Sequence, residues 1–221
     1  MNKQSITMAF IISIEGNIGS GKSTYLSYLK KYCSNKIIFV KEPVEDWEQI
    51  RDRETNETML QKFYKDQNKY SFSFQMMAFI SRFSILRETV RQNPSAIIIT
   101  ERCLYTDKYV FAKMLFEMKN IEDVNYQIYN KWFEEFALEF PINKIIYIRA
   151  TPEKCFERIQ KRNRIGESEI PLDYLINCDK YHQDMIKILS DTTEIIYIDG
   201  NIDIYENPNM IREWMIQCGL Q

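Results

Sequence analysis

The stretch AFIISIEGNIGSGKST, residues 9–24, decides how this chain folds. Residues 9–14 form a short apolar run rich in β-branched side chains, which is typical of a strand buried on both faces of a parallel sheet. Three of the six glycines in the chain, Gly16, Gly19 and Gly21, follow within six residues. Glycine is costly in regular structure and useful where backbone turns tightly or approaches a ligand. The pattern therefore predicts a strand, a tight loop and then a helix.

The loop matches a phosphate-binding pattern, in which a glycine and four further residues precede Gly21, Lys22 and Ser23. Backbone N–H groups of such a loop converge on phosphate oxygens, and the helix N-terminus adds positive potential. Lys22 can reach the β- and γ-phosphates, and the Ser23 hydroxyl can hold Mg²⁺. The residues predicted to bind a nucleoside triphosphate are Gly16, Asn17, Ile18, Gly19, Ser20, Gly21, Lys22, Ser23 and Thr24. A GTPase is disfavoured, because the chain has no NKxD motif and no DxxG after a strand.

The rest of the chain repeats the alternation of apolar runs and helical segments. Further apolar runs lie at 37–41, 96–99, 144–149 and 194–199. Between them are segments with helical spacing; one carries Phe72, Met76, Phe79, Ile80 and Phe83 on one face. This alternation predicts an α/β fold of the P-loop NTPase type, with a five-stranded parallel sheet flanked by helices on both faces. No linker or repeat is visible, so we expect residues 1–221 to form one domain.

Composition narrows the setting in which the protein works. The 221 residues are 45% hydrophobic and carry a formal net charge of −2, so no global basic field is available and we expect no nucleic-acid partner. Five cysteines without CxxC spacing predict a reducing compartment and no zinc site. The early apolar run is too short to span a bilayer. We therefore expect a cytoplasmic protein without a membrane partner.

Two acidic residues follow predicted strands at the edge where ligands bind in open α/β sheets. Glu42 begins EPVEDW, and Glu101 begins ERC with Arg102 beside it. A carboxylate facing the γ-phosphate can accept a proton from an attacking hydroxyl, a second can hold Mg²⁺, and an arginine can neutralise charge on the moving phosphoryl group. We predict catalytic roles for Glu42, Arg102, Lys22 and Glu101, and a metal role for Ser23 and Glu101. The alternative is that both acids are strand-end caps or surface charges.

The basic run RIQKRNR at 158–164 precedes a polar segment containing Gly166. We predict an arginine-rich lid over residues 158–169, in which Arg158, Arg162 and Arg164 close over the phosphates and exclude water. The alternative is a solvated helix face, which is common for basic runs.

Taken together, the motifs resemble the deoxynucleoside kinases of the deoxycytidine/deoxyguanosine kinase group. The matching segments occur in the order of that family and span nearly the whole chain: GNIGSGKST, EPVEDW, SFSFQMMAFISR, ERCLYTDKYVFA, RIQKRNR and IPLDYL. The resemblance implies ATP-dependent phosphorylation of a deoxynucleoside 5′-hydroxyl, with Glu42 as base. Asp203, in the segment 202–204, would border the ATP adenine. The family is typically homodimeric through helices, and the helix bearing Phe133 and Phe136 is a candidate interface.

The same resemblance implies a deoxynucleoside pocket. Gln75 would bind the base edge, while Tyr64 and Glu167 would bind the sugar 3′-hydroxyl. The apolar walls would be Ile18, Trp47, Leu60, Phe63, Phe74 and Phe111. At the positions that vary with substrate the chain has Ala78, Arg82 and Asp107, and thymidine-accepting relatives look apolar at the last two. We expect deoxyadenosine or deoxycytidine, with deoxyguanosine as a further candidate, over thymidine. The alternative is that Arg82 and Asp107 form a structural ion pair that reads no base.

Some alternatives and one departure stay open at this point. The chain has Cys103 where the family commonly has serine. The single histidine, His182, is read as a surface or helix-packing residue. A thymidylate-type nucleoside monophosphate kinase would need an extra cationic contact for the acceptor's phosphate. A non-catalytic module would bind ATP without forming product.

Overall fold

The five apolar runs form five parallel strands of one sheet. The computed structural model describes residues 9–34, 36–164, 167 and 169–220. The strands are β1 (Phe10–Glu15), β2 (Ile37–Val40), β3 (Ile97–Glu101), β4 (Lys144–Arg149) and β5 (Glu194–Asp199). Each lies within two residues of its predicted bounds, so the predicted five-stranded parallel sheet is confirmed. Glu101 is the last residue of β3 rather than the first after it.

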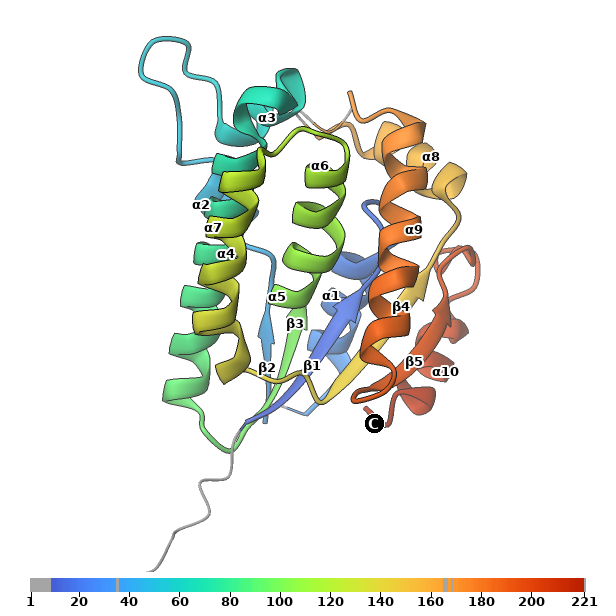
Figure 1. The fold of residues 1–221 in the computed structure, drawn as a ribbon. Helices are drawn as coiled ribbons and strands as arrows, with labels where there is room; N and C mark the ends of the chain where they lie inside the picture. Colours follow the sequence, from blue (N-terminus) through green and yellow to red (C-terminus); the bar gives the residue numbers. More distant parts are fainter. Residues whose placement is uncertain (1–8, 35, 165–166, 168, 221) are drawn as a thin grey trace, which may run out of the picture.

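The strand order, β2-β3-β1-β4-β5, places the first strand at the centre of the sheet. β1 pairs with β3 through Ile12 and Ile99 and with β4 through Ile12 and Lys144. The strands are parallel, so all five end at one edge, and the segments that follow them meet there. The loop Gly16–Gly21 lies at the middle of that edge (Figure 1).

Helices cover both faces of the sheet, as predicted (Figure 1). On one face, α1 (Lys22–Tyr32) and α10 (Asn209–Gln217) pack on the sheet, with the Tyr25 and Trp214 rings edge to face at 5.8 Å. The other face is covered by α4 (Gln67–Gln92), α7 (Asp123–Phe136), α8 (Pro152–Arg162) and α9 (Leu172–Leu189). Two apolar cores result, one on each face of the sheet.

Short helices complete the edge where the strands end. They are α2 (Val44–Trp47), α3 (Met59–Lys65), α5 (Leu104–Thr106), the π-helix η1 (Asp107–Ala112) and α6 (Lys113–Glu117). The 3₁₀-helix η2 (Ala137–Glu139) continues α7 at the opposite edge, shortly before β4 begins. π-helical turns are rare and occur frequently at functional sites. Here the turn carries Asp107 and Phe111, two of the residues predicted to contact substrate.

The helix α4 was predicted correctly, but one residue of its predicted apolar face is exposed. Phe79 and Phe83 of α4 are buried, but Ile80 is 45% exposed, so its predicted place on the buried face was wrong. The buried face of α4 carries Ala78, Phe79, Arg82 and Phe83. Ile80 lies about 100° around the helix beyond Phe79, on the side away from Ala78, so it faces outward. The predicted lid over residues 158–169 includes residues 165, 166 and 168, which lie outside the described residues.

The loop Gly16–Gly21 is held against α8 by a close backbone approach. A Cβ atom at Gly19 would lie 2.6 Å from the Cys155 carbonyl oxygen, and the backbone there has φ +81°. Gly21 also has a left-handed φ, +103°, but nothing lies within 4 Å of its hypothetical Cβ. The two glycines therefore separate the cost of strained backbone from the cost of a steric clash.

We predict that Gly19→Ala lowers the free energy of unfolding by about 2–4 kcal/mol, because it adds a clash with backbone to the strain of a left-handed alanine. Gly21→Ala carries the strain alone and should cost about 1 kcal/mol. Urea unfolding of the two variants measures the difference. Equal losses of stability would show that α8 does not press on the loop.

Candidate active site

A single cavity of about 540 Å³ joins the loop after β1 to the ends of β2 and β3. Its lining includes every side chain predicted to hold a sugar or base. These are Ile18, Glu42, Trp47, Leu60, Phe63, Tyr64, Phe74, Gln75, Ala78, Arg82, Arg102, Asp107, Phe111 and Glu167. Most of the residues predicted to hold the nucleotide line it as well: Gly19, Ser20, Gly21, Lys22, Ser23, Thr24, Arg158, Arg162, Arg164 and Asp203.

Asn17 and Gly16 are the two predicted nucleotide-binding residues that do not line the cavity. The Asn17 side chain is 2% exposed and donates to the Leu175 carbonyl at 2.8 Å. It anchors the loop to α9 instead of facing a phosphate. Gly16 has φ +144°, and its carbonyl oxygen accepts a hydrogen bond from Arg102.

Lys22 begins α1 with its ammonium group folded back over the loop. Its Nζ donates to the Asn17 carbonyl at 2.7 Å, and the side chain is 5% exposed. Burial, together with the charge of Arg102, lowers the pKa of Lys22 to about 8. An anion on the loop would stabilise the protonated form, because an opposite charge offsets desolvation.

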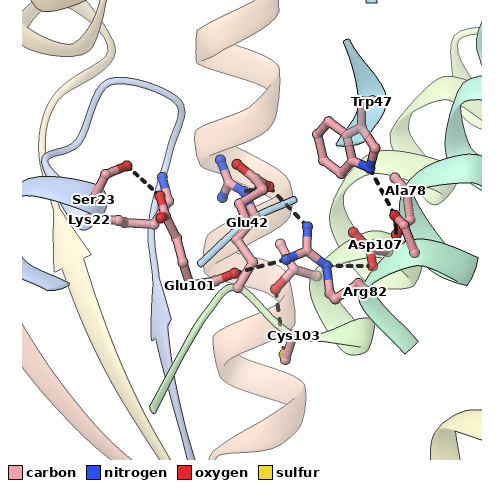
Figure 2. A network of polar contacts seen from close by, with 12 residues as sticks. Lys22, Ser23, Glu42, Trp47, Ala78, Arg82, Glu101, Cys103 and Asp107 are labelled. Atoms are coloured by element: carbon pink, nitrogen blue, oxygen red, sulfur yellow. Dashed lines mark hydrogen bonds and ion pairs between the residues drawn. The ribbon is translucent and has the colours of Figure 1, made fainter. Parts of the chain in front are cut away.

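Ser23 and Glu101 provide two adjacent oxygen ligands. The Ser23 hydroxyl donates to Oε1 of Glu101 at 2.5 Å, which links the start of α1 to the end of β3 (Figure 2). Hydroxyl and carboxylate oxygens suit Mg²⁺, which usually takes one or two protein ligands together with phosphates and water. Within the described residues no cluster of three or more metal-binding side chains occurs. The pair therefore fits a cation that is completed by a bound nucleotide.

Glu42 lies between two arginines at the centre of the cavity. Its Oε1 accepts from Arg82 Nη2 at 2.9 Å and from Arg102 Nε at 3.2 Å. Burial would raise the pKa of Glu42, but Arg102 and Arg82 outweigh it and lower the pKa to about 2. The carboxylate is therefore ionised at any neutral pH, and can accept hydrogen bonds or a proton.

Arg102 is held in a strained position. Its backbone is left-handed, with φ +64°, which a non-glycine residue adopts only when its surroundings favour it. Nη1 donates to the Gly16 carbonyl at 2.7 Å, and the guanidinium lies 5.1 Å from the centre of the Phe111 ring. These contacts aim the charge at the space between Glu42 and the loop.

Arg82 connects Glu42 and the end of β3 to Asp107 at the far end of the cavity (Figure 2). Nε donates to Asp107 at 2.9 Å, Nη1 to the Glu101 carbonyl at 2.8 Å and Nη2 to Glu42. Burial raises the pKa of Asp107 to about 6, since Arg82 offsets the desolvation only in part. Arg82 and Asp107 thus form the predicted ion pair, with further contacts that the sequence did not reveal.

Aromatic rings wall the far end. The Phe63 and Phe74 rings stack at 4.5 Å, and Trp47 meets Phe74 edge to face at 5.7 Å. Gln75 is 1% exposed, and its side-chain oxygen has no hydrogen-bond partner among the described residues. A buried acceptor without a partner is costly, so it is suited to a donor on a ligand.

The structure also shows cavity residues that sequence reasoning missed. Tyr174, Tyr205 and Trp214 line the cavity, although none was assigned a role. Tyr174 lies within the IPLDYL motif, which was a usable signal. His182 is fully buried, with its ring 6.1 Å from that of Phe111, so it is a helix-packing residue rather than a surface one.

Comparison with known proteins adds an independent finding to this geometry. Residues 12–218 match the family model described as deoxynucleoside kinase. The chain belongs to the deoxynucleoside kinase family. It is 34% identical over 203 residues to a mitochondrial deoxyguanosine kinase of Xenopus laevis, an alignment that covers 84% of this chain and 76% of the relative.

Other curated members of the deoxynucleoside kinase family are similarly close. A probable deoxycytidine kinase of fowlpox virus is 34% identical over 207 residues, covering 90% of this chain and 82% of its own. A deoxycytidine kinase of Rattus norvegicus is 32% identical over 229 residues, covering 91% and 88%. Membership confirms the resemblance seen in the motifs and makes this protein an ATP-dependent phosphotransferase acting on deoxynucleosides.

We predict that ATP binds the free enzyme with an affinity that falls about tenfold per pH unit once the pH exceeds about 8. The reason is that Lys22 loses its proton there and no longer offsets the phosphate charge. Calorimetric titration with ATP and Mg²⁺ from pH 6.5 to 10 measures the slope. Lys22→Arg stays charged and should flatten the profile even if its affinity is lower. A wild-type affinity that is constant across this range would contradict the prediction.

Proposed function

We propose that this kinase transfers the γ-phosphate of ATP to the 5′-hydroxyl of deoxyadenosine or deoxycytidine, with deoxyguanosine as a further substrate, in preference to thymidine. The observation that carries the proposal is the position of Glu42. It stands in one continuous cavity between the loop ending at Lys22 and the aromatic pocket ending at Asp107. A nucleoside in that pocket and a triphosphate on that loop would meet at this carboxylate.

The polar end of the pocket supports the choice of base. Arg82 and Asp107 can hydrogen-bond amino groups and ring nitrogens, and they occupy the space that a thymine methyl group needs. Gln75 offers a buried amide whose oxygen lacks a partner among the described residues. Arg82 also binds Glu42 and the Glu101 carbonyl, so it has a structural role whether or not it reads a base.

The sugar would be held at its 3′-hydroxyl by Tyr64 and Glu167. Both side chains line the cavity. Burial and the nearby charge of Glu167 raise the pKa of Tyr64, so its hydroxyl stays protonated and can donate. Glu167 also pairs with Arg162 and, at 2.9 Å, with Arg164. In the proposed function these two arginines form the lid over the phosphates.

The chemistry needs little more than position and charge. Glu42 orients the 5′-hydroxyl and accepts its proton as the phosphoryl group arrives. A weakly basic carboxylate suffices, because the transition state of phosphoryl transfer is loose. Arg102 neutralises charge near the 5′-oxygen, and Lys22 does so on the phosphates. Ser23 and Glu101 would hold Mg²⁺, which supplies further neutralisation when it is bound with ATP.

We propose that the enzyme is a homodimer joined through α7. Phe133 is buried against the core, so it is not available to a partner. The exposed stripe of the helix consists of Val124, Ile128 and Trp132, at 64%, 42% and 42%, spaced four residues apart. Apolar side chains at this spacing share one helix face and suit a second copy of the same helix.

We predict a sedimentation mass of two chains for the wild type and of one chain for Trp132→Glu, because a charge in an apolar interface is not neutralised. Ile188→Glu, on α9, places the same charge at a 48% exposed position away from α7 and should leave the dimer intact. A wild-type monomer, or a dimeric Trp132→Glu variant, would remove α7 from this role.

We also propose that residues 1–221 form a single functional domain and that the protein is cytoplasmic. Among the described residues no helix combines the length and apolarity needed to cross a bilayer. The name of the frog relative places that protein in mitochondria. Imaging of the tagged chain in its host would decide the location.

The test of the function is a product assay with ATP and Mg²⁺ against the four deoxynucleosides and their monophosphates. We expect deoxyadenosine or deoxycytidine to react at least ~10-fold faster than thymidine, because Arg82 and Asp107 would occupy the space that the thymine methyl group needs. Faster reaction of the monophosphates would favour a thymidylate-type kinase. ATP binding without any product would favour the non-catalytic module.

Glu42→Gln and Arg102→Ala serve as variants in the same assay. Each should lower turnover at least ~100-fold while the far-ultraviolet circular dichroism spectrum stays that of the wild type. Near-normal turnover in either variant would remove that residue from its proposed role.

A further inference from the structure

Arg158 lies in α8, yet its guanidinium does not point freely over the cavity. Nη1 donates to the Gly200 carbonyl at 2.7 Å and to the Ser20 carbonyl at 3.3 Å. Nη2 lies 3.4 Å from the Ile202 carbonyl. One side chain therefore joins two segments far apart in the sequence: the phosphate-binding loop and the β5–α10 loop, residues 200–208.

The helix that carries Arg158 is fixed to the phosphate-binding loop. Cys155 and Ile159, on either side of Arg158 along α8, are fully buried. Gly19 leaves no room for a Cβ atom between itself and this helix, since one would lie 2.6 Å from the Cys155 carbonyl and 3.0 Å from the Ile159 side chain. α8 ends only after Arg162, where Asn163 adopts a left-handed conformation. Arg158 thus belongs to the fixed wall, whereas Arg162 and Arg164 belong to the lid.

The β5–α10 loop has few other ties on the side facing the cavity. At its start, Gly200 N–H donates to the Arg149 carbonyl and Asn201 accepts from the Thr151 backbone. Asp203 accepts from the Tyr205 backbone at 2.9 Å, a bond within the loop itself. Ile202 and Ile204 pack partly against the core, and Tyr205 is 75% exposed. The Arg158 side chain links this loop to the phosphate-binding loop.

We propose that Arg158 is a positioning residue that sets the distance between the phosphate-binding loop and the β5–α10 loop. The inference rests on the proposed function, in which the first loop takes the triphosphate and the second borders the adenine. A fork of N–H groups can bond carbonyls of both loops at once, and it holds them at a fixed separation. ATP is then recognised by its span from phosphate to base.

Mutation of a positioning arginine and mutation of a lid arginine should have different effects on ligand affinity. A lid arginine contacts phosphate, so its removal weakens every triphosphate equally and lowers turnover. A positioning residue such as Arg158 affects the binding of ligands that reach both loops. Inorganic triphosphate reaches only the phosphate-binding loop. Loss of Arg158 should also loosen the β5–α10 loop when no ligand is present.

The experiment compares the full-length wild type with Arg158→Ala and Arg158→Lys. Calorimetry with the Mg²⁺ complexes of ATP and of inorganic triphosphate gives the two affinities. We expect Arg158→Ala to weaken ATP at least ~10-fold and inorganic triphosphate less than ~3-fold. Arg158→Lys should recover little of the loss, because its single nitrogen keeps the charge but cannot replace both Nη1 and Nη2, which together bond the Ser20, Gly200 and Ile202 carbonyls. Arg212→Ala removes an exposed arginine of α10 and is the matched control.

Hydrogen–deuterium exchange of the ligand-free variants provides the second readout. Amides of residues 200–207 should exchange faster in Arg158→Ala and Arg158→Lys than in the wild type or in Arg212→Ala. Equal losses of affinity for both ligands, full rescue by lysine, or unchanged exchange in the loop would each overturn the proposal. Exchange is measured without substrate, so it tests the role of Arg158 even if no deoxynucleoside is phosphorylated. Failure of the positioning role can therefore be distinguished from failure of the proposed kinase function.

Discussion

The bridge that Arg102 makes between the Gly16 carbonyl and the Glu42 carboxylate is the contact on which the site depends. It spans 2.7 Å to the first and 3.2 Å to the second, and so it joins the ends of β1 and β2 through a residue just after β3. The left-handed backbone of Arg102 costs about 1–3 kcal/mol. Surrounding contacts must offset that cost. The same contacts leave a charged group facing the space where a phosphoryl group would move.

Electrostatic asymmetry follows from the way two carboxylates share Arg82. Glu42 has a second cation, Arg102, and its pKa falls to about 2, whereas Asp107 has Arg82 as its nearest cation and its pKa rises to about 6. Glu42 is therefore ionised throughout the neutral range, whereas Asp107 takes up a proton as the pH falls through about 6. A single guanidinium thus ties the proposed base-reading end of the cavity to the proposed catalytic acid. Substrate choice and catalysis would not be separable at Arg82.

The nucleotide side of the cavity divides into a wall formed by α8 and the proposed lid. α8 presses on the glycine loop at Gly19, and Arg158 extends that wall to the β5–α10 loop. Arg162 and Arg164 lie at and beyond the end of the helix and pair with Glu167. Because Glu167 is also proposed to hold the sugar, the lid and the acceptor site share one carboxylate. Closure over ATP and binding of the nucleoside would then be linked events.

Sequence alone was enough to predict the parallel sheet and the loop Gly16–Thr24, because strand period and glycine spacing are local properties. The side chains of the sugar and base pocket were predicted from the resemblance of the ordered motifs to the deoxynucleoside kinases. The sequence could not show that Asn17 turns away to Leu175, that Ile80 faces out, or that Arg158 bonds backbone carbonyls. Nor could it show that Arg82 serves Glu42 as well as Asp107. Each of these depends on which partner lies opposite a side chain across the fold. Only the packing of strands and helices brings residues separated by 25 to 158 positions within hydrogen-bonding distance.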